Sequence, residues 1–207
     1  MVKEGIPFVS VPLAIAAVFA FLYFWIGGVG FLVGLFIFVF LAAFMAYFFR
    51  DPKRNIPIGD NLIISAADGK VTRIDETADG KLVSVFLSPI DVHINRAPIG
   101  GKVIKVDYQK GKKVPATRND SSLVNERNSI TLQNEKMTVV CTQIAGILAR
   151  RIVCWSKTGD NLALGEKYGL IKFSSRTDLL MPKEVEILVN IGDRVVGGET
   201  IIAKLLN

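Results

Sequence analysis

Residues 5–49 read GIPFVSVPLAIAAVFAFLYFWIGGVGFLVGLFIFVFLAAFMAYFF and contain no Asp, Glu, Lys, Arg or His. A helix needs about 20 apolar residues to cross the hydrocarbon core of a bilayer, so the run is too long for one span and sufficient for two. A secretory signal peptide would show one short apolar region before a polar mature start, whereas here a second apolar block follows directly. We therefore predict that residues 1–50 form a transmembrane or membrane-embedded helical hairpin.

The reversal of the hairpin is predicted at WIGGVGF, residues 25–31, because its three glycines accept backbone conformations that other residues avoid. The two helices are then expected near residues 8–25 and 31–49. Two prolines, Pro7 and Pro12, disturb the first segment and leave a tilted or shallow insertion open.

Positive residues flank both ends of the hairpin, with Lys3 before it and Arg50, Lys53 and Arg54 after it. The positive-inside bias predicts that both ends face the cytoplasm, so the expected location is the cell membrane with the remaining chain on its cytoplasmic side. The formal net charge of +6 fits a surface held near anionic headgroups. The basic residues are scattered and no nucleic-acid motif accompanies them, which disfavours a nucleic-acid binder.

Residues 51–207 alternate short β-prone runs with turns rich in Gly, Asp and Asn, which predicts a mainly β soluble domain of the α+β class. One short helical piece is expected near GILARR, residues 146–151. The strand-like runs begin at Leu62, Lys70, Lys81, Lys102, Ser129, Met137, Arg150, Leu170, Glu184 and Thr200.

Two segments of this domain resemble the halves of a small lipoyl or biotinyl sandwich. In residues 189–205, the turns Gly192-Asp193 and Gly197-Gly198 separate short hydrophobic strands. Residues 66–75, AADGKVTRID, show a similar pattern of a turn beside a short strand. No lysine lies at the tip of such a hairpin, so no carried cofactor is expected. Cys141 and Cys154 lie in apolar runs without a pairing motif, which predicts reduced core cysteines.

The single histidine of the chain, His93, is the first candidate for chemistry. A lone histidine is more often structural than catalytic, but Asp91, Asn95 and Arg96 surround this one, and the prolines of LSPIDVHINRAP, residues 87–98, are expected to hold the segment out of regular structure. Because no second His and no Cys pair stands at ligand spacing, a metal site is not predicted.

A second candidate is GLIKFSSRTDLLMP, residues 169–182, where a strand-like run stops at two hydroxyls. A serine hydrolase would use Ser175 or Ser174 with His93 and an aspartate, Asp68 or Asp91. Neither serine lies in a G-x-S-x-G elbow, which counts against that reaction. A membrane module without catalytic activity is a further alternative.

Six motifs share one order and spacing with a known family. They are FFRDP (48–52), ADGKV (67–71), LSPIDVHINRAP (87–98), NERN (125–128), QIAGILARRIV (143–153) and GLIKFSSRTD (169–178). From about Tyr47 to its end, the chain resembles the phosphatidylserine decarboxylases of the short class. The resemblance implies decarboxylation of phosphatidylserine or archaetidylserine, a membrane anchor and a homodimer.

The resemblance also implies that the enzyme makes its own pyruvoyl cofactor from a serine, and Ser175 matches that serine. Self-cleavage between Ser174 and Ser175 would divide the domain of residues 51–207 and give chains 1–174 and 175–207. The family has glycine before the serine, whereas this chain has Ser174, and a register shifted to Ser174 stays open. A side chain at this position is expected to slow cleavage, since it resists the strained backbone that the attack requires.

Five further residues acquire expected roles from the resemblance. Asp68 and His93 are the partners expected to deprotonate Ser175. Longer relatives have a second histidine where this chain has Arg96, so both proton-handling tasks are expected to fall on His93. Arg150, Arg151 and Arg176 are candidates for the lipid phosphate or the substrate carboxylate because guanidinium groups match such anions, and a solvated basic face is the alternative.

Overall fold

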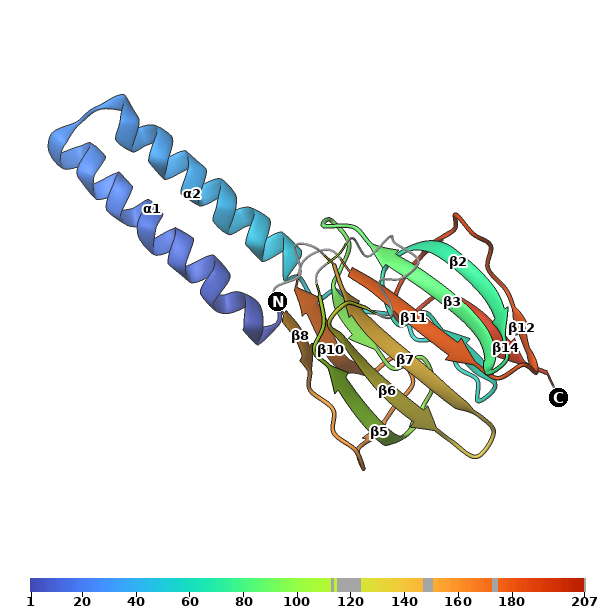
Figure 1. Ribbon diagram of the computed structural model, residues 1–207. Coiled ribbons are helices and arrows are strands. Elements are labelled where there is room, and N and C mark those ends of the chain that lie inside the picture. Colours follow the sequence, from blue (N-terminus) through green and yellow to red (C-terminus); the bar gives the residue numbers. More distant parts are fainter. Residues whose placement is uncertain (113, 115–123, 147–150, 173–174, 207) are drawn as a thin grey trace. The chain divides into compact units, whose positions relative to one another are not determined.

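The computed structural model describes residues 1–206 except 113, 115–123, 147–150 and 173–174. The chain divides into two compact units, Met1–Pro52 and Lys53–Asn207 (Figure 1). The first unit is helical and the second is built from antiparallel strands.

The helical unit is the predicted hairpin. A short 3-10 helix, η1 (Lys3–Gly5), leads into α1 (Ile6–Ile26), and α2 (Val29–Phe48) returns beside it. At 1.5 Å per residue each helix is about 30 Å long, which matches the hydrocarbon thickness of a bilayer. Both helices are long and apolar enough to cross a membrane. The prediction of a hairpin of two apolar helices is therefore confirmed.

The reversal is tighter than the sequence indicated. Gly27 and Gly28 make it alone, with φ angles of 78° and 104°, whereas Gly30 already lies in α2. The two helices approach closely at Gly34, where an added Cβ would lie 2.3 Å from the ring of Phe19. That ring stacks on Phe38 at a centroid distance of 5.6 Å. Glycine at position 34 thus lets an aromatic side chain fill the interface.

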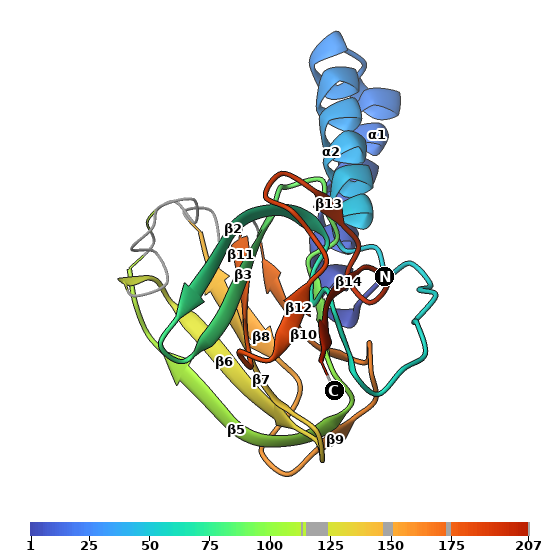
Figure 2. The ribbon, with the colours of Figure 1, turned by 90° about the vertical axis from the view of Figure 1, so that its right-hand side faces the viewer.

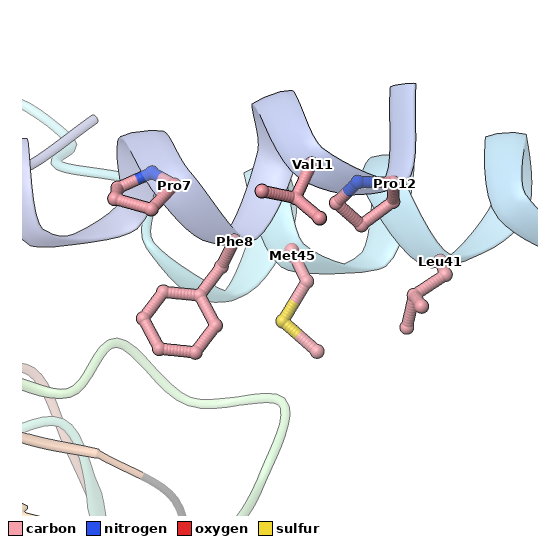
Figure 3. Close-up of a pocket in the computed structure, with 6 residues that line it drawn as sticks. All are labelled: Pro7, Phe8, Val11, Pro12, Leu41 and Met45. Carbon is pink, nitrogen blue, oxygen red and sulfur yellow. The ribbon is translucent and has the colours of Figure 1, made fainter. Parts of the chain in front are cut away.

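The first helix is continuous although Pro12 lies inside it, and Pro7 lies in its first turn, where no helical N–H is lost. Near these prolines the hairpin carries an apolar groove of about 320 Å³ (Figure 3). Its lining residues are Pro7, Phe8, Val11, Pro12, Leu41 and Met45.

The second unit confirms the prediction of a mainly β domain. Its strands are β1 (Leu62–Ile64), β2 (Gly69–Thr77), β3 (Gly80–Leu87), β4 (Ile94–Arg96), β5 (Gly101–Gln109), β6 (Arg127–Gln133), β7 (Thr138–Ala145), β8 (Arg151–Cys154), β9 (Asn161–Leu162), β10 (Lys167–Lys172), β11 (Ser175–Met181), β12 (Val185–Ile187), β13 (Arg194–Val195) and β14 (Ile201–Leu205). The helical piece expected near GILARR falls mostly on residues 147–150, outside the described part of the chain.

The strands form one large sheet and two small ones. The large sheet has the order β13-β2-β3-β11-β7-β6-β5-β9 and curls (Figure 2), while β1-β14-β12 and β4-β10-β8 form the small sheets. One hydrophobic core joins residues of all three, including Val83, Cys141 and Leu179 of the large sheet and Tyr168 and Ala203 of the small ones. Alternate residues of the large sheet therefore face the small sheets.

The segments that resemble lipoyl halves lie together. Strand β13 pairs with β2, with Val195 opposite Gly69, and β14 pairs with β1, with Ala203 opposite Ile63. The strands of the C-terminal segment thus pair with strands from the start of the domain. Both cysteines are free: Cys141 is buried and Cys154 is half-buried.

Three strands, β4, β9 and β11, were not predicted. Strand β11 lies in the middle of the large sheet, between β3 and β7, although its first residues are polar. Strand β4 includes Asn95 and Arg96, so the expectation that prolines hold this whole segment out of regular structure is wrong. Its prolines lie outside the three residues that pair with β10, where they remove no ladder hydrogen bond.

Because β11 is central, its core side chains are expected to be sensitive to truncation. Leu179→Ala, at a fully buried position, should lower the free energy of unfolding by about 2–5 kcal/mol through lost burial and a residual cavity. Leu180→Ala, at the adjacent half-buried position on the opposite face, is the matched control and should cost clearly less. Urea denaturation of the detergent-solubilised protein measures both, and equal losses would contradict the inward orientation of Leu179.

Candidate functional site

Ser175 is the first residue of β11 and lies opposite Leu87 of β3 and Ala145 of β7. The residue is fully buried, and its Oγ has no hydrogen-bond partner among the described residues. A buried hydroxyl without a partner is uncommon because desolvation is then uncompensated. Such a group is a candidate for chemistry, and Ser174, the other predicted serine, lies outside the described residues.

The segment that carries His93 leaves β3 immediately after Leu87, beside Ser175. Its turn is closed by Asp91, whose Oδ2 accepts hydrogen bonds from the backbone N–H of Ser88 at 2.8 Å and from its hydroxyl at 2.6 Å. Arg194 binds the other oxygen of Asp91 at 3.2 Å. Asp91 therefore has a structural task, and the turn that precedes His93 is fixed.

The imidazole of His93 is buried, and its Nδ1 lies 2.9 Å from the carbonyl oxygen of Asp91. A carbonyl only accepts, so Nδ1 carries the hydrogen and the neutral ring keeps its lone pair on Nε2. The backbone N–H of Ile171 in β10 donates to the carbonyl of His93 at 3.1 Å. His93 is thus held beside the strand that runs toward residues 173–174, with Nε2 as its basic atom.

Asp68 is engaged elsewhere. Its carboxylate accepts hydrogen bonds from Arg54 at 2.8 and 2.9 Å and from the backbone N–H of Gly197 at 2.8 Å. Both side chains of the ion pair are mostly buried, with exposed fractions of 9% for Arg54 and 16% for Asp68. The described contacts therefore bind Asp68 to Arg54 and Gly197, and Ser175 is not among its described partners.

The predicted arginines lie in different environments. Arg176 forms a buried ion pair with Asp178 at 2.8 Å. Because side chains alternate along a strand, this pair lies on the face of β11 opposite Ser175. Arg151 begins β8 and is exposed. Arg150 lies outside the described residues, and Arg96 donates to the carbonyl of Gly165 at 3.1 Å.

A buried chain of polar side chains was not predicted as a unit. It runs from Asn128 through Gln143 and Asn95 to Thr177, two residues after Ser175. The sequence did contain a signal. Gln143 takes an inward position in the alternating run of β7, where apolar residues are the rule.

The cysteines do not offer a thiolate. The Sγ of Cys141 lies 2.9 Å from the hydroxyl of Tyr168, and burial raises the pKa of the thiol to about 12. Burial also raises the pKa of Tyr168 well above its usual value, and that of the Cys154 thiol above its own. Among the described residues, no cluster of His, Cys, Asp and Glu has the arrangement of a metal site.

Comparison with known proteins agrees with the motifs. The family model for phosphatidylserine decarboxylase matches residues 41–203. A phosphatidylserine decarboxylase proenzyme of Solibacter usitatus is 43% identical over 207 residues, covering 100% of this chain and 98% of the relative. A second such proenzyme, of Symbiobacterium thermophilum, is 42% identical over 211 residues, covering 98% of this chain and 94% of the relative.

Proposed function

We propose, from the premise that this chain belongs to the phosphatidylserine decarboxylase family, that Ser175 is the serine from which its pyruvoyl group is made. The chain is a proenzyme that cuts itself and then decarboxylates phosphatidylserine with a serine-derived pyruvoyl group. The observation that carries the assignment is the buried Oγ of Ser175, without a described partner, at the first position of a central strand.

Maturation needs only groups of this chain and water. The Oγ of Ser175 attacks the carbonyl carbon of residue 174, the C–N bond breaks, and an ester with a free amino group results. Removal of the Cα proton then expels the carboxylate of residue 174 and leaves a double bond in residue 175. Water finally replaces the amino nitrogen, which departs as ammonia. His93 is the proposed base, because its Nε2 lone pair is set by the bond from Nδ1 to Asp91.

The surroundings of Ser175 fit the group that it would form. Leu87 and Ala145, its neighbours in β3 and β7, are fully buried and apolar, so they limit the access of water. A pyruvoyl carbonyl would supply an electron sink, which accepts the electrons of the bond that breaks when carbon dioxide leaves. The task of His93 in turnover is to accept a proton at its Nε2 and to return it from the same atom.

Asp68 and the arginines hold secondary places in the proposal. Asp68 is paired with Arg54, so we assign it a supporting role and not that of the base. Arg151, which is exposed, is the favoured contact of the lipid phosphate, with Arg150 beside it in the sequence. Arg176 is a weaker candidate because Asp178 already balances its charge.

The Ser175 assignment is tested by intact mass spectrometry. The purified protein should give two chains, residues 1–174 and residues 175–207, the second of which lacks a free amino group at its start. Ser175→Ala should give one full-length chain, because alanine has no hydroxyl to attack residue 174. Cutting of this variant at the same bond would exclude Ser175, and one uncut wild-type chain with esterase activity would instead favour the serine hydrolase.

A substitution of His93 tests the proposed base. No other histidine exists in the chain, and Arg96 remains protonated, so it cannot substitute as a base. His93→Ala should slow maturation by about 10²–10⁴-fold, the usual contribution of general acid–base catalysis. The uncut fraction after a pulse of synthesis reports maturation, and carbon dioxide release per cut molecule reports turnover. Near-normal values of both would assign His93 a structural role.

The hairpin associates the enzyme with the membrane, and we propose that both of its ends are cytoplasmic. Lys3, Arg50 and Lys53 support this orientation through the positive-inside bias, whereas Arg54 is already paired with Asp68. The family resemblance further predicts a homodimer, which light scattering of the detergent-solubilised protein would measure.

The orientation is tested with protease added to sealed right-side-out cells. The β domain should survive, because it lies behind the membrane. Addition of the same protease after permeabilisation is the control and should degrade it. Digestion in intact cells would place the domain outside.

A further inference from the structure

Four buried polar side chains form one continuous hydrogen-bonded chain in the core. Asn128 Nδ2 donates to Gln143 Oε1 at 3.1 Å, and Gln143 Nε2 donates to Asn95 Oδ1 at 2.9 Å. Asn95 Nδ2 then donates to Thr177 Oγ1, also at 2.9 Å. All four residues are at most 2% exposed. The order of donors and acceptors is uniform, so each amide takes a defined orientation.

This chain of hydrogen bonds crosses from one sheet to another. Asn128, Gln143 and Thr177 lie in β6, β7 and β11 of the large sheet, where Gln143 is in register with both of the others. Asn95 lies in β4 of a small sheet, opposite Gly169 of β10. Asn95 therefore attaches the small sheet to the large one by its side chain.

Through Asn95, this chain of hydrogen bonds connects β10 and β11, the two strands on either side of the proposed cleavage bond. Strand β10 ends at Lys172, β11 begins at Ser175, and the two belong to different sheets. Asn95 pairs with β10 through its backbone and with β11 through Thr177, which shares a face with Ser175. Gly169 permits the crossing, since a Cβ there would lie 2.4 Å from the carbonyl oxygen of Val153 and 3.0 Å from Gln143 Nε2.

We propose that Asn95 and Thr177 are positioning residues for self-cleavage, which rests on the assignment of Ser175 in the proposed function. Their hydrogen bond fixes the position of β10 relative to β11, and so constrains how the Oγ of Ser175 approaches the carbonyl carbon of the preceding residue. Attack requires these atoms at about 3–3.5 Å, and a displacement of about 1 Å costs about 10²-fold in rate. Apolar packing would hold the sheets together without such a directional constraint.

The test compares two substitutions of Thr177. Thr177→Val keeps the shape and removes the acceptor, and it should slow the appearance of the fragment 175–207 by about tenfold or more. Thr177→Ser keeps the hydroxyl and should restore the rate to within about twofold, because the bond to Asn95 can form again. Rates are measured by pulse labelling and electrophoresis of the full-length protein.

Thr142→Val is the matched control. Thr142 lies on the adjacent strand β7, and its hydroxyl bonds Ser129 at 2.8 Å on the opposite face of the sheet. This variant loses a comparable hydrogen bond and should cut at the normal rate. Melting temperatures of Thr177→Val and Thr142→Val are compared in the Ser175→Ala background, where both proteins stay uncut. Similar melting temperatures with different cutting rates would support the proposal.

Three outcomes would overturn the positioning role: normal cutting by Thr177→Val, equal slowing by Thr142→Val, or a failure of Thr177→Ser to restore the rate. If Thr177→Val does not fold, Thr177→Cys replaces it, since sulfur is a weak acceptor at the same place, and normal cutting by that variant would also overturn the proposal. Cleavage by Ser175→Ala would instead refute the Ser175 assignment itself, so the two failures are distinct.

Discussion

The pairing of β11 with both β3 and β7 is the constraint on which the rest of the domain depends. The strand is bonded to β3 from Ser175 to Met181 and to β7 from Ser175 to Leu180. It therefore joins the two halves of the large sheet, and its inward side chains contribute to the core. The same strand begins at the proposed pyruvoyl residue, so the reactive group is held by backbone that pairs with a neighbour on each side.

The elements that the sequence predicted correctly are those in which apolar periodicity decides the structure. The two helices follow from a run without charges, and strands such as β3 and β7 follow from alternation between turns. Strand β11 could not be found in this way, because Ser175, Arg176, Thr177 and Asp178 are all polar. The burial of Arg176 and Asp178 is compensated by their ion pair, and that of Thr177 by Asn95, which is 82 residues away in the sequence.

The sequence suggested which residues belong to the candidate site, but not which side chains contact one another. The motifs pointed to Ser175 and His93, and both are buried, Ser175 at the start of β11 and His93 just before β4. Local sequence could not show that Asp68 is bound by Arg54, or that Asp178 balances Arg176. Such pairings depend on which strands become neighbours, and strand order is a property of the whole chain.

The interlocking of the two ends of the domain has a consequence for the cut enzyme. If the cut falls at the proposed bond, residues 175–207 contribute β11, β13 and β14, which pair with β3, β7, β2 and β1 of the other chain. Before cleavage these pairings form within one molecule, but afterwards an unfolded enzyme would have to bring two separate chains together and would lose the high effective concentration of a single chain. The lifetime of the mature enzyme is thus set by its rate of unfolding, because two separated chains would not refold as one molecule.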